Sequence, residues 1–509
     1  MLRADLDLAA TAPAPVGKRD DSSARFASLA WVSSLVRRAL ALLAVVVLAA
    51  VAVVALFGDQ AGRRSRLAPA AGGDSGADPL AYSPSRQRDL EEAAARGNAH
   101  VIYAKSPGGA RASAERTASY RPLVEAVATP AGIEPDMLEA IVLLESAGRP
   151  DAAADPRLEG AVGLTQILAE TGRNLLGRRI DPGAARRIGR SLRRAIRRAD
   201  GALVQRLLAR RRSVDERFDP PKALAAAARY LQIARAKLRR EDLAVVSYHM
   251  GIGNLQTALR LYGQDDIPYA RLYFDSTPLR HAQAWQKLAS LGDDSSTYLW
   301  RVMAARDIMR LYRSDPLALD RISALQNAKN SAEEVLHPQA ETELFETPSQ
   351  LREAYLDRDI VPLPSPLLKQ HGARIGTQMG ELAGRLGHPR ALYRGLRPEA
   401  LALLVVLSAG TKEISSQSPL LLTSTVRDQR YQRVLLARNR EATPNYSLHT
   451  TGYAFDILRS YRSRSQALAL EFMLGRLQSL DLIAWVREPA AIHVTVSARA
   501  RELLGVLAR

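Results

Sequence analysis

The stretch GIEPDMLEAIVLLESAG, residues 132–148, decides the fold of the region around it. Its apolar residues recur at helical spacing, Pro135 suits a first helical turn, and Gly148 suits the position after a helix ends. Glu145 then falls in the last turn, beside apolar neighbours and close to the negative end of the helix dipole. Burial and the dipole both disfavour a carboxylate, so Glu145 is expected to hold its proton near neutral pH and to serve as a general acid.

The helical pattern extends far beyond this stretch. From 119 to 314 apolar residues recur at helical spacing with almost no strand-like alternation, which predicts an all-helical domain. An insertion at 173–218 is rich in arginine, as in RRAIRR and LLARRR. It is either a solvated helical face or a surface that docks on phosphate-bearing lipids or wall polymers.

Three motifs follow Glu145 in order: GAVGLTQI at 160–167, Thr171-Gly172, and SYHMGIGNL at 247–255. Together with Glu145-Ser146 they resemble the soluble-lytic-transglycosylase family over about 120–260. His249 departs from the asparagine usual in that family.

The resemblance implies a lysozyme-like, mostly helical fold without a cofactor. It also implies cleavage of the β-1,4 bond between N-acetylmuramic acid and N-acetylglucosamine, with a 1,6-anhydro ring as product. Glu145 would act first as acid and then as base, and Tyr248 would support Glu145 or the sugar. The residues expected to bind substrate are Ser146, Gly163, Gln166, Tyr248 and Asn254.

A water-using muramidase is an alternative to the lyase. Asp151, Asp155 and Glu159 lie shortly after Glu145. One of them would supply the second carboxylate, which either attacks the sugar as a nucleophile or activates a water. Spacing along the chain does not give the distance between carboxylates that separates the two reactions.

The pattern of residues 391–509 predicts an α+β domain, with strands expected at LLLTSTV (420–426), LIAWV (482–486) and IHVTV (492–496). SLHTTGYAFDI contains His449 and Asp456, and His493 stands in the last expected strand. Two histidines and a carboxylate suit Zn²⁺ with one position open for water.

These residues resemble the zinc D-alanyl-D-alanine carboxypeptidase and dipeptidase family over about 395–500. The resemblance implies that His449, Asp456 and His493 are metal ligands and that Arg427 supports the scissile carbonyl. The family's catalytic glutamate falls here at Ala490, and Glu488 lies two residues earlier. We therefore expect a degenerate domain that binds peptide stems, with a peptidase that uses Glu488 as base as the alternative.

An unbroken apolar run at 39–57 is long enough to cross the hydrocarbon core of a membrane as a helix. A cleaved signal peptide is the alternative. We expect a cytoplasmic tail at 1–38, a flexible linker at 58–118 and a connector at 315–390. The protein would then be single-pass in the inner membrane, with most of the chain in the periplasm.

Composition narrows the partners. The 509-residue chain has no cysteine, which excludes disulfides and thiolate catalysis, and its net charge of +18 suits an anionic partner. Because the anchor places most of the chain outside the cytoplasm, nucleic acid is not expected. The expected partners are peptidoglycan glycan strands, their peptide stems and the membrane.

The sequence thus predicts a multidomain protein with a single N-terminal transmembrane helix, an all-α lysozyme-like domain and a C-terminal α+β metallopeptidase-like domain. The expected function is a membrane-anchored lytic transglycosylase. The contrasting hypothesis is an envelope scaffold that binds peptidoglycan without cutting it.

Overall fold

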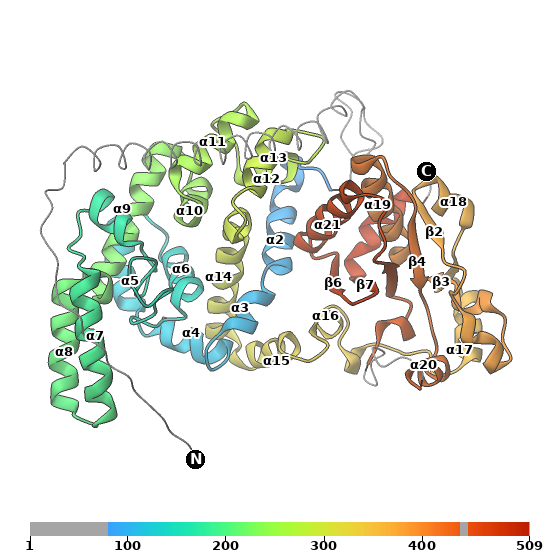
Figure 1. The fold of residues 1–509 in the computed structure, drawn as a ribbon, viewed down its shortest axis with the longest axis horizontal. Helices are drawn as coiled ribbons and strands as arrows, with labels where there is room; N and C mark the ends of the chain where they lie inside the picture. The colour runs from blue at the N-terminus through green and yellow to red at the C-terminus, as the bar shows by residue number, and fades with distance from the viewer. Residues whose placement is uncertain (1–79, 438–445, 508–509) are drawn as a thin grey trace, which may run out of the picture. The chain divides into compact units, whose positions relative to one another are not determined.

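The computed structural model describes residues 80–437 and 446–507 (Figure 1). All of these residues belong to one compact unit. The predicted cytoplasmic tail and the predicted membrane helix at 39–57 lie outside the described residues. Within those residues, no helix combines the length and the apolar character needed to span a membrane.

The first part of the described chain is helical. Its helices are α2 (Gln87–Gly97), α3 (His100–Lys105), α4 (Ala110–Ala118), α5 (Arg121–Ala128), α6 (Pro135–Ser146), α7 (Pro182–Arg197), α8 (Gly201–Val214), α9 (Pro220–Leu238), α10 (Glu241–Met250), α11 (Ile252–Tyr262), α12 (Tyr269–Asp275), α13 (Ala282–Ala289) and α14 (Tyr298–Ser314). Short 3₁₀ turns lie at Pro84–Arg86, Glu216–Phe218 and Asp294–Thr297, and a π turn at Thr171–Leu175.

Helix α6 lies at the centre of this region and packs on α4, α5 and α14. Every residue from Met137 to Leu143 is buried, so α6 is a core helix rather than an amphipathic one. Pro135 begins it, and Ala147 ends it in the left-handed conformation, with its N–H donating to the Leu143 carbonyl. The helix predicted from 132–148 is therefore present, with Glu145 in its last turn.

The flexible linker predicted at 58–118 is wrong from residue 80 onward. Helix α2 packs on α14, and α4 packs on α6 and α14. The buried side chains of both helices are mostly small: Leu90, Ala93, Ala94 and Ala95 on α2, and Ala110, Ser113, Ala114 and Thr117 on α4. Alanine and serine gave this segment a linker-like composition, but small side chains also let helices approach closely.

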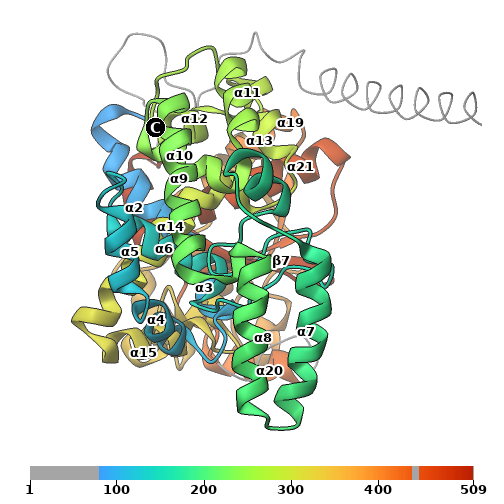
Figure 2. The ribbon, with the colours of Figure 1, turned by 90° about the vertical axis from the view of Figure 1, so that its left-hand side faces the viewer.

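The arginine-rich insertion forms an antiparallel helical hairpin, α7 and α8, that projects from the helical region (Figure 2). Asp181 and Asp200 begin the two helices by accepting the backbone N–H of Ala184 and Leu203. The hairpin buries an apolar stripe of α7 made of Ala185, Ile188, Leu192 and Ala195. The exposed arginines of α7 are Arg186, Arg187, Arg190, Arg193, Arg194 and Arg197.

The C-terminal part is built on a five-stranded sheet in the order β2-β4-β5-β7-β6. Its strands are β2 (Ala373–Ile375), β4 (Leu420–Ser424), β5 (Ala454–Leu458), β6 (Ile483–Arg487) and β7 (Ala491–Val496). Strands β2 and β4 are parallel, and the other pairs are antiparallel. The strands expected at 420–426, 482–486 and 492–496 are present, whereas the central strand β5 was not predicted.

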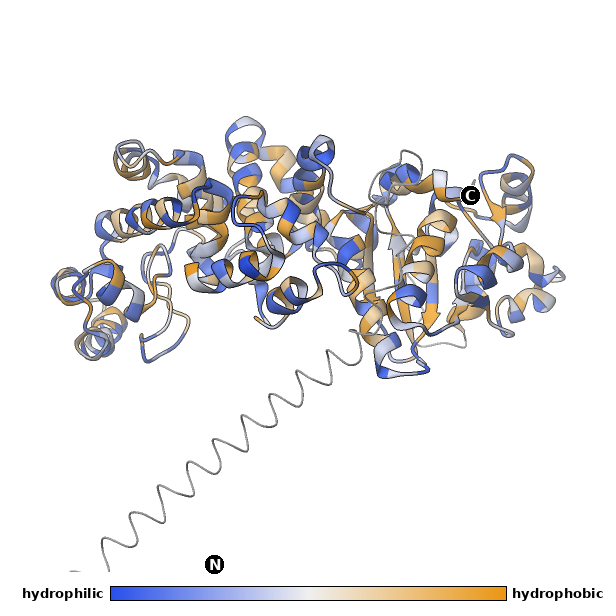
Figure 3. Ribbon diagram, turned by 90° about the horizontal axis from the view of Figure 1, so that it is seen from above, coloured by the Kyte–Doolittle hydropathy of each residue, from blue (hydrophilic) through white to orange (hydrophobic). Residues whose placement is uncertain are grey.

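Two helices pack against this sheet, α19 (Pro398–Ser415) on β7 and α21 (Arg464–Ser479) on β6. Figure 3 shows largely apolar strands lying between helices. The remaining elements are α15 (Pro316–Gln326), α16 (Ser331–Glu334), α17 (Pro348–Leu356), α18 (Ser365–Gln370), α20 (Gln429–Leu436), the two-stranded sheet of β1 (Val361–Pro362) and β3 (Gly395–Leu396), and short 3₁₀ turns at Gln339–Glu341, Glu381–Leu386, Arg390–Tyr393, Leu448–Thr450 and Ala498–Val506.

The segment predicted as a connector, 315–390, is packed on both of its neighbours. Helix α15 contacts α14 and α4, α16 contacts β6, and β2 is the edge strand of the large sheet. The helical part also touches α21 and the turn that follows it. The Arg476 guanidinium of α21 donates to the carbonyls of Tyr273 and Ser276, and Arg96 pairs with Asp481, just after α21, at 3.1 Å.

Gly148 follows α6 with φ at +72°, and a Cβ there would lie 2.6 Å from the Thr117 amide nitrogen of α4. Gly177 also has a positive φ, +62°, but nothing lies within 4 Å of its would-be Cβ. Alanine pays about 1–2 kcal/mol for this backbone conformation at either position. At Gly148 the overlap should add on the order of 1–3 kcal/mol.

We therefore expect Gly148→Ala to lower the free energy of unfolding clearly more than Gly177→Ala, as measured by urea titration. Equal losses for the two variants would contradict the close approach of α4 to the end of α6.

Candidate active site and candidate metal centre

Glu145 is half-buried at the end of α6 and faces a pocket of about 260 Å³. One wall of this pocket comes from α3 and the turn after it, inside the segment that composition suggested was a linker. The lining residues are Val101, Ile102, Lys105, Ser106, Pro107, Leu143, Leu144, Glu145, Ser146, Ala147, Arg149, His249, Asp294, Tyr298 and Arg301.

Burial raises the pKa of Glu145 from its usual 4.5 to about 7, although the hydrogen bond from Tyr298 acts in the opposite direction. The Tyr298 hydroxyl donates to Glu145 Oε1 at 2.6 Å. A carboxyl of this pKa is partly protonated at neutral pH, and its conjugate base is a better proton acceptor than an ordinary carboxylate. Glu145 is therefore suited to donate a proton and then to recover one.

Tyr298 contacts Glu145 directly, and the sequence did not reveal it. It begins α14, it is buried, and it follows Glu145 by 153 residues without a motif around it. Its ring stacks on Tyr248, with ring centroids 6.3 Å apart, and on His249, at 5.2 Å. Burial and the nearby Glu145 raise the pKa of Tyr298 well above 10, so its hydroxyl remains a neutral donor.

Tyr248 lies one ring away from Glu145 rather than in direct contact with it. Its hydroxyl donates to the Thr165 carbonyl at 2.7 Å, which fixes the loop at 160–167 to α10. The tyrosine that contacts Glu145 is Tyr298, and Tyr248, expected to support Glu145 or the sugar, stacks against Tyr298.

Three of the predicted substrate-binding residues stabilise the local backbone structure. Ser146 Oγ donates to the Leu164 carbonyl at 2.8 Å and is buried in the wall of the pocket. Gln166 Nε2 donates to the carbonyls of Ala152 and Gly163. A Cβ on Gly163 would overlap the Arg217 carbonyl, and its φ of +82° also favours glycine.

Asn254 donates through Nδ2 to the Met250 carbonyl and accepts from Lys287 through Oδ1. Gly163, Gln166, Tyr248 and Asn254 do not line the pocket in front of Glu145.

The carboxylates proposed for a hydrolase, Asp151, Asp155 and Glu159, also lie outside the lining of this pocket. Asp155 accepts the backbone N–H of Gly160 at 3.0 Å, and such bonds lower its pKa. Asp294 is instead the other carboxylate that lines the pocket, paired with Arg301, which lowers the pKa of Asp294.

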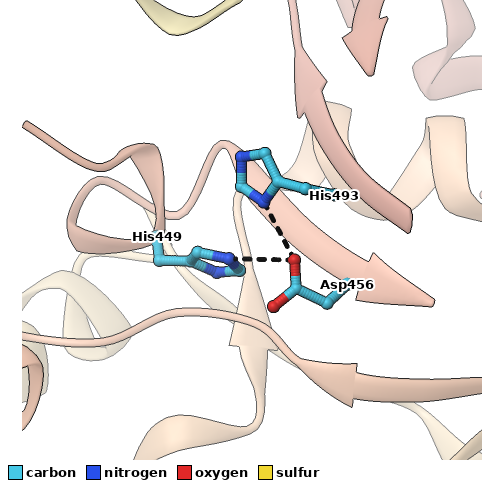
Figure 4. A group of neighbouring side chains, drawn as sticks. All are labelled: His449, Asp456 and His493. Atoms are coloured by element: carbon cyan, nitrogen blue, oxygen red, sulfur yellow. Dashed lines mark hydrogen bonds and ion pairs between the residues drawn. The ribbon is translucent and has the colours of Figure 1, made fainter. Parts of the chain in front are cut away.

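His449, Asp456 and His493 meet in the C-terminal part, where one ligand atom from each lies within 4.8 Å of the others (Figure 4). His449 stands on the 3₁₀ turn at Leu448–Thr450, and Asp456 and His493 face each other across β5 and β7. Asp456 Oδ1 lies 3.2 Å from His449 Nε2 and 2.9 Å from His493 Nδ1. Two imidazoles and a carboxylate that converge in this way fit a divalent transition metal.

In both histidines, the ring nitrogen that faces away from the candidate centre also has an oxygen partner. His449 Nδ1 donates to the Thr425 carbonyl at 2.8 Å, and His493 Nε2 lies 3.2 Å from Glu333 Oε1. A metal-ligating histidine commonly donates its outer N–H to such a group. Burial opposes ionisation of Asp456, but the two histidines hold the pKa of this carboxyl well below its usual range.

Arg427 joins this centre to a second pocket of about 360 Å³, which it lines together with Ser424, Tyr393 and Tyr431. Its guanidinium lies 3.4 Å from Asp456 Oδ2 and also donates to Ser424 Oγ.

Glu488 and Ala490 lie in the turn between β6 and β7. Glu488 is half-buried, and its backbone N–H donates to the Ala491 carbonyl.

Residues 198–269 match the family model described as Transglycosylase SLT domain. The match runs from the α7–α8 hairpin to the start of α12, so it includes Tyr248, His249 and Asn254 but neither Glu145 nor the loop at 160–167. No curated protein matches this chain. The matched segment supports the lytic-transglycosylase resemblance, a lysozyme-like helical region, and peptidoglycan as the substrate of a transglycosylase-type enzyme.

Proposed function

We propose that the protein is a lytic transglycosylase that cuts the glycan strands of peptidoglycan, with Glu145 as its catalytic acid and base. The observation that carries the proposal is a carboxyl with a pKa of about 7 in a pocket, at the end of a buried helix. The family match over 198–269 supports the substrate class. Tyr298 holds Oε1, so Oε2 is the oxygen expected to carry the proton.

The reaction needs one carboxyl group. Protonated Glu145 gives its proton to the glycosidic oxygen as the bond from muramic C1 to that oxygen breaks, which leaves a free hydroxyl on N-acetylglucosamine. The Glu145 carboxylate then takes the proton of the muramyl C6 hydroxyl, whose oxygen bonds to C1 and closes the 1,6-anhydro ring. The proton returns to Glu145, and no water is consumed.

A hydrolytic muramidase is the second candidate, because Asp294 also lines the pocket. Arg301 lowers the pKa of Asp294, so this carboxyl is charged when Glu145 is protonated. A charged carboxylate beside a protonated one is the arrangement that hydrolases use to activate water or to attack the sugar. The lyase is preferred because the family match points to it.

For the C-terminal part we propose a zinc-dependent domain that binds peptide stems. His449, Asp456 and His493 would hold the ion, which would supply a Lewis acid for a peptide carbonyl. Arg427, beside Asp456 and on the wall of the second pocket, would bind a carbonyl or carboxylate of the stem. Ala490 occupies the position of the family's catalytic base, so binding is favoured over cutting; a peptidase with Glu488 as base is the alternative.

The apolar run at 39–57 supports a single-pass anchor in the inner membrane, with the described part of the chain in the periplasm beside peptidoglycan. A scaffold that binds peptidoglycan without cutting it shares this location. It gives no reason for a Glu145 carboxyl with its pKa raised to about 7.

Glu145→Gln should abolish release of 1,6-anhydro-muropeptides from purified sacculi, measured by mass spectrometry. Glu115→Gln, an exposed glutamate on α4, should release them as the wild type does. Products with reducing ends, lost in Asp294→Asn, would instead establish the muramidase. No product from the wild type would support the scaffold.

The same variant should be more stable at alkaline pH. Because the folded-state pKa of Glu145 is about 7 and its ordinary value is 4.5, the wild type loses stability as pH rises through this range. Glutamine avoids this loss, so Glu145→Gln should gain up to about 3 kcal/mol at pH 8 and little below pH 4. Thermal unfolding across pH measures the difference, and equal profiles would contradict the raised pKa.

Tyr298→Phe should shift the pH profile of the lyase. The lost hydroxyl stabilised the Glu145 carboxylate, so without it the pKa of Glu145 rises and the alkaline limb of kcat/KM moves to higher pH. Tyr312→Phe, on the same helix but outside the pocket lining, should leave the limb in place. An unmoved limb in Tyr298→Phe would refute the assigned contact.

Full-length protein expressed with zinc and then dialysed should hold about one equivalent of zinc, as measured by mass spectrometry of the metal. His449→Ala should lose it, whereas His388→Ala, a histidine outside the cluster, should retain it. A wild type without zinc would overturn the proposed centre.

A further inference from the structure

Glu333 is a buried carboxylate that neither family resemblance includes. Its side chain is buried, with the residue 6% exposed. It lies in the first turn of α16, well before the expected C-terminal domain at 391–509. Its Oε1 lies 3.2 Å from His493 Nε2 and accepts the backbone N–H of Leu448 at 3.1 Å. One oxygen therefore touches a metal-site histidine and the residue that precedes the other one.

The two nitrogens of His493 face different groups. Nδ1 faces Asp456 Oδ1, at the point where the three candidate ligands converge, and Nε2 faces Glu333. His449 is arranged in the same way, with Nε2 toward Asp456 and Nδ1 toward the Thr425 carbonyl. Each imidazole thus presents one nitrogen inward and has an oxygen acceptor behind the other.

We propose that Glu333 is the positioning carboxylate of the C-terminal metal centre, an inference that rests on the proposed zinc site. It does not ligate the ion, because it contacts the outer nitrogen of His493. Its contact fixes the tautomer and the orientation of His493, and a charged acceptor there makes Nδ1 a stronger ligand. Its bond to Leu448 holds the turn that carries His449.

The burial of Glu333 argues for such a role. A carboxylate removed from water is costly unless charged or donating groups surround it. Its contacts, His493 and the Leu448 N–H, both belong to the candidate centre. An apolar side chain would fill the same space without that cost if packing were its sole purpose.

A consequence is that the metal centre extends beyond the β-sheet domain. Helix α16 packs on β6, and its glutamate reaches His493 across 160 residues of sequence. The connector at 315–390 thus supplies part of the site, and a fragment that begins at 391 would lack it.

The test uses the full chain, stripped of metal with a chelator and titrated with Zn²⁺ against a chromophoric competitor. Glu333→Gln keeps the shape of the side chain and removes its charge, so zinc affinity should fall about 10–100-fold. Glu334→Gln is the matched control, because Glu334 is adjacent and bonds Asn330 and the Gln339 backbone instead of the centre; it should bind zinc as the wild type does. Substituted Co²⁺ should show a changed visible spectrum only in Glu333→Gln.

The outcomes separate this inference from the zinc proposal itself. If the wild type binds zinc, His449→Ala loses it and Glu333→Gln keeps full affinity with an unchanged Co²⁺ spectrum, the role of Glu333 is refuted while the zinc site stands. A lower melting temperature in Glu333→Gln without loss of affinity would likewise make Glu333 merely structural. A wild type that binds no zinc would overturn both proposals.

Discussion

The packing of α6 against α14 is the contact on which the helical part depends. Together with α4 and α5 it buries α6 on nearly every side, and it brings Tyr298, at the start of α14, to Glu145, at the end of α6. The same burial that stabilises the helix pair withholds water from the Glu145 carboxyl and raises its pKa. The burial that stabilises the helix pair therefore also raises the pKa of Glu145. It costs stability once the pH is high enough to ionise this carboxyl.

The two candidate sites use burial with opposite results. At Glu145 the neutral hydroxyl of Tyr298 donates to the carboxyl, desolvation prevails, and the pKa rises to about 7. At Asp456 two histidines and Arg427 surround a buried carboxyl, and the interactions with the histidines outweigh desolvation. The difference lies in the neighbours rather than in the residue type, which is why a carboxylate in a sequence does not by itself reveal its protonation state.

Much of this could be predicted from the sequence because the signals were local. Proline and glycine mark the ends of α6, and the residues around His449, Asp456 and His493 carry the resemblance that named these three as expected metal ligands, although the strand of Asp456, β5, was not predicted. Tyr298 and Glu333 could not be found in that way, because each acts on a residue more than 150 positions distant and neither has a motif. Helices α2 and α4 were missed since their buried faces are built mostly from alanine, serine and threonine, which also make up linkers.

The α7–α8 hairpin is destabilised by repulsion between its own positive charges. Residues 182–214 contain eleven arginines and one acidic residue, so folding brings like charges together, for example Arg190 with Arg186 and Arg194, four positions away on either side. Each such pair destabilises a helix by roughly 0.2–0.5 kcal/mol, and mobile anions screen the repulsion. The buried apolar stripe of α7 and the two aspartate caps stabilise the hairpin despite this repulsion. Added salt, which weakens most surface ion pairs, should therefore strengthen this element, and a polyanion laid along it would act as the counter-charge that its own sequence lacks.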